Sequence, residues 1–192
     1  GGASLRIQNF LNIGKTVIAR GKIAVPGIQM DINLLQPKSI GSVKLSSSNP
    51  YEKPIIDPNY LDDQRDLDDL TEAFKYIRFV SQQKAFKNIL GSELSPGNEI
   101  KTDEEIQKSI RELTTTGHHP VSTCRMGIES DKGAVLDESL KVRGIKNLRV
   151  VDASAFPDQI NGNTNAAVIM MAEKAADMVL DFSPLNREDP RD

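Results

Sequence analysis

Both histidines and the single cysteine of this 192-residue chain lie in one short segment, TTTGHHPVSTCRMG, residues 114–127. These residue types can support a metal site, a thiol nucleophile or a general base. Zinc needs three or four converging ligands, whereas neighbouring side chains on extended backbone point to opposite faces. We therefore predict no metal site here. A lone cysteine is usually a small buried side chain, and we expect Cys124 to be one rather than a nucleophile.

His119 is the residue of this segment best suited to act as a general base. Pro120 follows it and biases its backbone towards an extended conformation. A base must be held within hydrogen-bond reach of the proton that it takes, and a stiff backbone favours this. A structural histidine followed by proline would show the same pattern, so both interpretations stay open on these residues alone.

A second segment, LRVVDASAFPDQINGNTNAAVIMMAEKAADMV at residues 148–179, places polar residues around a helix start. The sequence predicts a short buried strand over 148–151 that ends at Asp152, and an apolar helix after Asn165. Asparagine is a favoured N-cap, and the first turn of a helix presents unpaired N–H groups that stabilise an anion or an electron-rich carbonyl. An ordinary cap preceded by two turn amides would explain the spacing equally well.

The elements that must position these segments are a mixture of strands and helices. Alternating apolar residues predict a strand over 28–34, which Pro37 ends, and 41–45 reads as a second strand. Spacings of three and four predict a helix from Asp66, with an apolar face made of Leu67, Leu70, Phe74 and Ile77.

Two further helices are predicted downstream, and the first 27 residues are weakly patterned. Thr102 and Glu105 form a capping box that starts a helix running towards the histidines. The helix over 166–180 is apolar all round near its start, which is typical of a helix surrounded by protein. Within residues 1–27, a short helix would fit the spacing of Ile7, Phe10 and Leu11. Residues 16–25 fit either a strand or a loop.

These elements predict an α+β fold with a mostly antiparallel sheet flanked by helices. No GxGxxG joins a strand to a helix, so a dinucleotide-binding fold is not expected within these residues. The net charge of −3 comes without a basic patch, which argues against a nucleic-acid partner. No apolar run approaches the roughly 20 residues of a membrane span. A single cysteine favours a reducing cytoplasm.

Taken together, the segments HHPVSTCRMG and GAVLDESLKVRGIKNLRVVDASAFPDQINGNTNAAVIMMAEKAADMVL resemble the C-terminal signature of the glucose-methanol-choline (GMC) oxidoreductases, the choline-dehydrogenase-like branch in particular. The earlier LLQPKSIGSVKLSSSNPYEKPIIDPNYLDDQRDLDDL resembles the opening of the same C-terminal domain. The resemblance implies three parts: a poorly assigned segment 1–27, a substrate-binding and catalytic domain 28–182, and a loose tail 183–192.

The resemblance implies a flavin-dependent alcohol oxidation. A histidine in the position of His119 serves as the base that accepts the hydroxyl proton, and the substrate carbon gives a hydride to the flavin N5. The second active-site position of the family corresponds to Asn165. An asparagine cannot act as a base, so it would bind the alcohol oxygen and leave the proton to His119.

The implied cofactor is FAD, and four residues match its contacts in the family. Asp152 and Ala153 would lie against the ribityl-phosphate portion, and backbone around Asn163 and Thr164 would meet the ring. The family usually has glycine at the position of Ser122, where a serine would crowd the backbone near the flavin.

The implied partners are a small alcohol and an N-terminal FAD-binding domain upstream in a longer parent chain. The present chain alone is then expected neither to hold FAD nor to turn over, and its apolar last helix would favour self-association. Two alternatives remain open: a non-catalytic module of the same fold that binds a small molecule or a partner, and a relative of the hydroxynitrile lyases.

Overall fold

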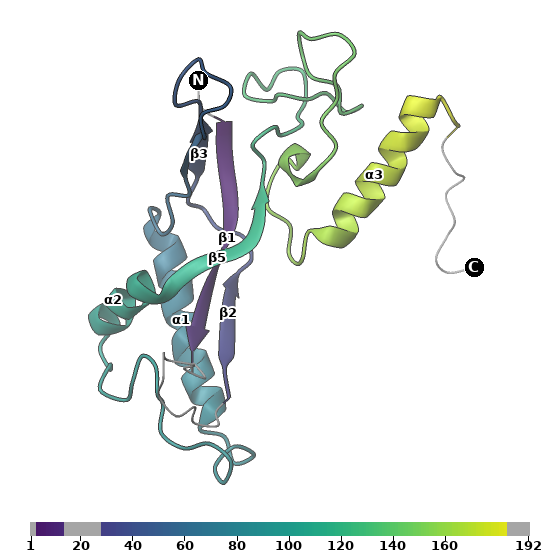
Figure 1. The fold of residues 1–192 in the computed structure, drawn as a ribbon. Helices are drawn as coiled ribbons and strands as arrows, with labels where there is room; N and C mark the ends of the chain where they lie inside the picture. Colours follow the sequence, from purple (N-terminus) through teal and green to yellow (C-terminus); the bar gives the residue numbers. More distant parts are fainter. Residues whose placement is uncertain (1–2, 14–27, 184–192) are drawn as a thin grey trace, which may run out of the picture. The chain divides into compact units, whose positions relative to one another are not determined.

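The computed structural model describes residues 3–13 and 28–183. Figure 1 shows the elements along the chain. The strands are β1 (Ala3–Ile13), β2 (Met30–Leu34), β3 (Gly41–Lys44), β4 (Ile55–Asp57) and β5 (Thr114–Val121). The helices are α1 (Gln64–Ser81), α2 (Asp103–Leu113), the 3₁₀ turn η1 (Ala153–Ala155) and α3 (Asn165–Leu180).

The strands form one sheet in the order β2-β1-β3-β4, and β5 also pairs with β1. The ladders between β1 and β2 and between β3 and β4 are antiparallel. The predicted α+β class with an antiparallel sheet is therefore confirmed.

The predicted short helix at Ile7, Phe10 and Leu11 is wrong, because these residues belong to β1. The strands that pair with β1 follow it at widely different distances along the chain, and β5 begins about a hundred residues later. Such pairing gives a backbone long-range hydrogen-bond partners that a local apolar pattern does not reveal. The residues 16–25, predicted as strand or loop, lie outside the described ranges.

The chain divides into two compact units, each with a hydrophobic core of its own. The unit of residues 7–41 and 58–118 holds α1, α2 and β2, and α1 contacts both of the others. The spacing predicted Leu67, Leu70 and Phe74 of its core but did not predict Leu61. The full core consists of Ile32, Leu34, Leu61, Leu67, Leu70, Phe74, Ile106 and Ile110. The predicted capping box is also present, because the Thr102 side chain accepts from the Glu105 N–H and Glu105 accepts in return from the N-cap backbone.

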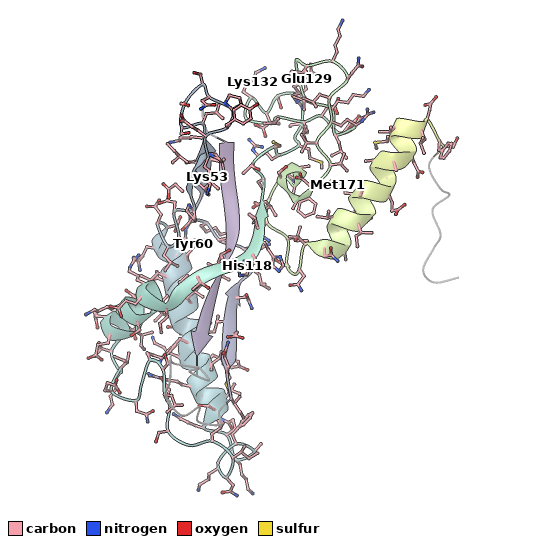
Figure 2. All side chains as sticks on the ribbon, in the orientation of Figure 1. Lys53, Tyr60, His118, Glu129, Lys132 and Met171 are labelled. Carbon is pink, nitrogen blue, oxygen red and sulfur yellow. The ribbon has the colours of Figure 1, made fainter. Side chains whose placement is uncertain are left out.

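The other unit consists of residues 1–6, 42–57 and 119–192, of which 3–6, 42–57 and 119–183 are described. Its core contains Val121, Leu136, Leu140, Ala155, Phe156, Met171 and Ala175. Met171, labelled in Figure 2, is one of the two buried residues of α3. No helix in the described ranges has the length and apolar character needed to cross a bilayer.

The predicted buried strand over 148–151 is wrong. Its backbone hydrogen bonds with Leu140 and Val142 amount to an isolated bridge between Lys141 and Arg149 and not to a strand, and Leu148 is 45% exposed. Gly144 and Asn147 both have left-handed backbone, with φ of 79° and 60°. The chain therefore turns back within a few residues, which leaves too little extended backbone for a ladder.

The start of α1 is fixed by a carboxylate with no solvent exposure. Asp66 accepts hydrogen bonds from the backbone N–H groups of Lys38, at 2.7 Å, and Ser39, at 2.9 Å. The Ser39 hydroxyl accepts in turn from the N–H of Asp63, which is the N-cap of α1. These bonds join the loop that follows β2 to the first turn of α1.

We expect Asp66→Ala to lower the free energy of unfolding by about 3 kcal/mol, because two backbone donors would lose their acceptor in a buried place. Chemical denaturation followed by circular dichroism measures the change. Asp69→Ala, an exposed aspartate on the same helix, is the matched control and should have a small effect. Equal midpoints for the two variants would contradict the importance of the Asp66 bonds.

Candidate functional site

The two histidines occupy different environments on β5. His119 is half-buried, whereas His118, labelled in Figure 2, is exposed and has a φ of 59°. Cys124 is a half-buried free thiol that packs against the core of its unit. Among the described residues, no three His, Cys, Asp or Glu side chains are grouped as a metal site requires.

Three backbone hydrogen bonds tie the segment after His119 to the predicted cofactor segment. The N–H groups of Ser122, Cys124 and Met126 donate to the carbonyls of Ala153, at 3.3 Å, Ser154, at 2.9 Å, and Ala155, at 2.9 Å. The two segments that resemble the family signature are therefore in direct contact, although 26 residues lie between Met126 and Ala153 in the sequence.

Side chains from the turn before α3 contact both ring nitrogens of His119. The Nε2 atom lies 3.1 Å from the Oδ1 of Asn163, and the Nδ1 atom lies 3.4 Å from the Oγ1 of Thr164. Asn163 is exposed and Thr164 is half-buried. The imidazole thus has its Nδ1 edge on the more buried side and its Nε2 edge on the more open side.

Asn165, the predicted second active-site residue, is the first residue of α3 and is exposed. Within the described part of the chain, its side chain forms no hydrogen bond with His119. Thr164 rather than Asn165 is the N-cap of α3. Sequence reasoning assigned Asn163 and Thr164 to backbone contacts with a cofactor and missed their side-chain contacts with His119. The sequence signal that could have indicated these contacts is a pair of short polar side chains directly after the turn glycine Gly162, whose φ is 148°.

The start of α3 can receive an electron-rich group. Its N-cap Thr164 forms no side-chain capping bond, and the first turn carries no acidic residue. Unpaired N–H groups of a first turn attract negative charge. This chemistry fits the pyrimidine carbonyl edge of a flavin, which gains electron density on reduction.

Asp152 is the N-cap of η1. Its Oδ1 accepts from the Ser154 N–H at 2.8 Å and from the Ser154 hydroxyl, so the carboxylate caps the 3₁₀ turn. Asp152 is exposed. An exposed carboxylate is an acceptor for hydroxyl donors, and this fits the ribityl chain of a flavin cofactor.

Ser122 has the backbone conformation of a glycine, with a φ of 72°. It is 3% exposed, and its Oγ is buried without a hydrogen-bond partner among the described residues. A side chain in the left-handed region is strained, and an unpaired buried hydroxyl is destabilising.

An ion pair stabilises the loop that follows the histidine segment. The Arg125 guanidinium binds both carboxylate oxygens of Asp131, which also accepts from the Gly133 N–H. Hydrogen bonds from Arg125 and Gly133 lower the pKa of Asp131 from 3.8 to about 2.

Comparison with known proteins gives a consistent family match. The family model for GMC oxidoreductase, C-terminal part, matches residues 37–172. The chain is 43% identical over 159 residues to an oxygen-dependent choline dehydrogenase of Vibrio vulnificus, covering 83% of this chain and 28% of that protein. It is 41% identical over 165 residues to the human mitochondrial choline dehydrogenase, covering 85% of this chain and 28% of the relative.

Solved structures have the same fold. An FAD-dependent oxidoreductase from Chaetomium thermophilum superimposes with a TM-score of 0.74 at 33% identity, over 80% of this chain and 26% of that one. The present chain therefore spans little more than a quarter of the length of the relatives that it matches.

Replacement of Ser122 by glycine should stabilise the protein by about 1 kcal/mol, because it removes both the left-handed strain and the unpaired hydroxyl. Ser122→Ala removes only the hydroxyl and should gain less. Thermal unfolding of both variants beside the parent sequence separates the two effects. A glycine variant less stable than the alanine variant would show that the strain at this position is negligible.

The Asp131 pair should make stability depend on pH in acid. Because the pKa of Asp131 is lowered on folding, its contribution is present above pH 4 and is lost as the pH falls from about 4 to about 2. Asp131→Asn should therefore melt below the parent sequence at pH 7, and the difference should shrink over that range. A difference that stays constant from pH 7 to pH 2 would exclude the ion pair as its source.

Proposed function

Because the chain belongs to the GMC oxidoreductase family, we propose that it is the substrate-binding and catalytic domain of an FAD-dependent alcohol oxidoreductase. The observation that carries this proposal is the position of His119, whose ring contacts Asn163 and Thr164 directly before the uncapped start of α3. The proposed base and the proposed electrostatic stabiliser of negative charge therefore belong to the same compact unit.

His119 is the proposed base. The alcohol hydroxyl would approach Nε2, the ring nitrogen on the more open side, and transfer its proton to that atom. Asn165 is the proposed ligand of the alcohol oxygen, to which its carboxamide can donate. Its exposed position at the first turn of α3 supports this role, since no neighbour within the described residues occupies its amide.

FAD is the proposed cofactor, and when bound it would supply the acceptor for the hydride. Asp152 and Ala153 would contact its ribityl-phosphate portion, with the Asp152 carboxylate accepting from a hydroxyl. The backbone of Asn163 and Thr164 and the first-turn N–H groups of α3 would face the ring. The FAD-dependent relative of known structure supports this assignment.

The proposed partner is an N-terminal FAD-binding domain in a longer chain. Exposed apolar side chains on α3 and just after it support this proposal, and they are Ile169, Met170, Val179, Leu180 and Phe182. In the isolated chain, the same exposed side chains would favour self-association. The proposed domain extends over residues 28–182. The proposed compartment is the cytoplasm, because a single cysteine is typical of proteins in a reducing environment.

We expect His119→Ala, made in the longer protein, to slow flavin reduction by two to four orders of magnitude, the usual effect of a lost general base. Stopped-flow absorbance of the flavin measures it. Choline is the first alcohol to assay, since two relatives carry the name choline dehydrogenase. His118→Ala, which changes the exposed neighbour, is the control.

An unchanged rate for His119→Ala would exclude His119 as the base. A longer protein that binds no flavin would overturn the enzyme assignment and favour a binding module. Bound flavin that no alcohol reduces would favour a lyase-like relative.

A further inference from the structure

The N-cap of α3 differs from those of α1 and α2 in the use of its side chain. Asp63 and Thr102 each accept a backbone N–H of the helix that they start. Thr164 is a residue type that commonly caps helices, yet its hydroxyl forms no such bond and lies 3.4 Å from the Nδ1 of His119. The Thr164 hydroxyl is therefore available to the imidazole and not to the helix.

The hydrogen-bonding capacity of the two contacts differs. The Oδ1 of Asn163 can only accept, so its contact with Nε2 at 3.1 Å is a hydrogen bond when Nε2 carries the ring hydrogen. In a neutral imidazole, the other nitrogen then has the lone pair, and the Thr164 hydroxyl can donate to it. A hydroxyl also accepts, so Thr164 can remain a partner of Nδ1 whether or not that atom carries a hydrogen.

We propose that Asn163 and Thr164 are positioning residues that set the tautomer of His119. Asn163 holds the ring in the Nε2–H tautomer. In this tautomer Nε2 already carries a hydrogen and cannot accept the proton of the alcohol. The alcohol hydroxyl must replace Asn163 at Nε2, and the ring hydrogen must then lie on Nδ1, where Thr164 accepts it. This inference rests on the base role proposed for His119.

The proton transfer balances without any further group. The alcohol O–H bond breaks, its proton forms a bond to Nε2, and the imidazole becomes a cation with hydrogens on both nitrogens. Thr164 accepts from Nδ1–H throughout this step. Asn163 therefore opposes substrate binding at the ring, whereas Thr164 supports the reacting tautomer.

The tautomer can be measured directly in the 192-residue chain, since His118 and His119 are its only histidines. Long-range ¹H–¹⁵N spectra, at a pH high enough for neutral rings, report which nitrogen carries the hydrogen. We expect His119 to be wholly Nε2–H, with the exposed His118 showing the averaged signals of a free imidazole. Asn163→Ala should convert His119 to averaged signals, and Asn163→Asp, which keeps an acceptor, should not.

This measurement needs neither FAD nor an alcohol, so it stands apart from the test of the proposed function. Three results would overturn the role of Asn163. Two concern the unaltered chain, in which His119 would show either the Nδ1–H tautomer or averaged signals. The third is an Asn163→Ala spectrum identical to that of the unaltered chain.

The role of Thr164 is tested with Thr164→Val and Thr164→Ser in the longer protein. Because Thr164 forms no capping bond, valine should leave α3 intact and remove only the contact with His119. We expect valine to slow flavin reduction at saturating alcohol about 10- to 100-fold, as for one lost hydrogen bond to a charged group, without raising the half-saturating alcohol concentration. Serine should restore the rate. Equal rates for valine and threonine, or a failure of serine to restore the rate, would overturn the role of Thr164.

Discussion

The three backbone hydrogen bonds from Ser122, Cys124 and Met126 to residues 153–155 are the constraint on which the site depends. They fix the end of β5 against the η1 turn, and so bring the strand that carries His119 beside the segment that leads into α3. Backbone bonds do not depend on side-chain identity. The arrangement therefore does not require particular side chains at these positions.

The buried Asp66 carboxylate and the proposed site lie in different units. The buried Asp66 carboxylate and the core of α1, α2 and β2 belong to one unit, whereas His119, Asn163, Thr164 and Asp152 belong to the other. In the second unit, the chain between Ser122 and Asp152 is mostly turns and isolated bridges, and the Arg125–Asp131 ion pair supplements the hydrophobic core. Substitutions at Asp66 and at the site should accordingly have separable effects.

How much the sequence could predict depended on the range of the interactions. The helices α1 and α2 follow from local signals, namely an apolar face and the Thr102 capping box, and their predicted starts lie within two residues of the observed ones. The strand β1 could not be predicted, because its partners β2, β3 and β5 are distant in sequence. His119 and the turn before α3 were singled out by motif, but the pairing of the ring with the Asn163 and Thr164 side chains requires the fold that brings residues 119 and 163 together.

The uncapped start of α3 affects how that helix behaves as well as what it binds. Helix ends that lack a capping partner fray first, and the energy for opening one turn is far smaller than that for unfolding a domain. The backbone from Asn163 into the first turn of α3 can therefore exchange its amide hydrogens and shift its conformation while Met171 and Ala175 stay in the core. A capping bond would stabilise this polar end of the helix. Because the bond is absent, the end can rearrange around an incoming molecule.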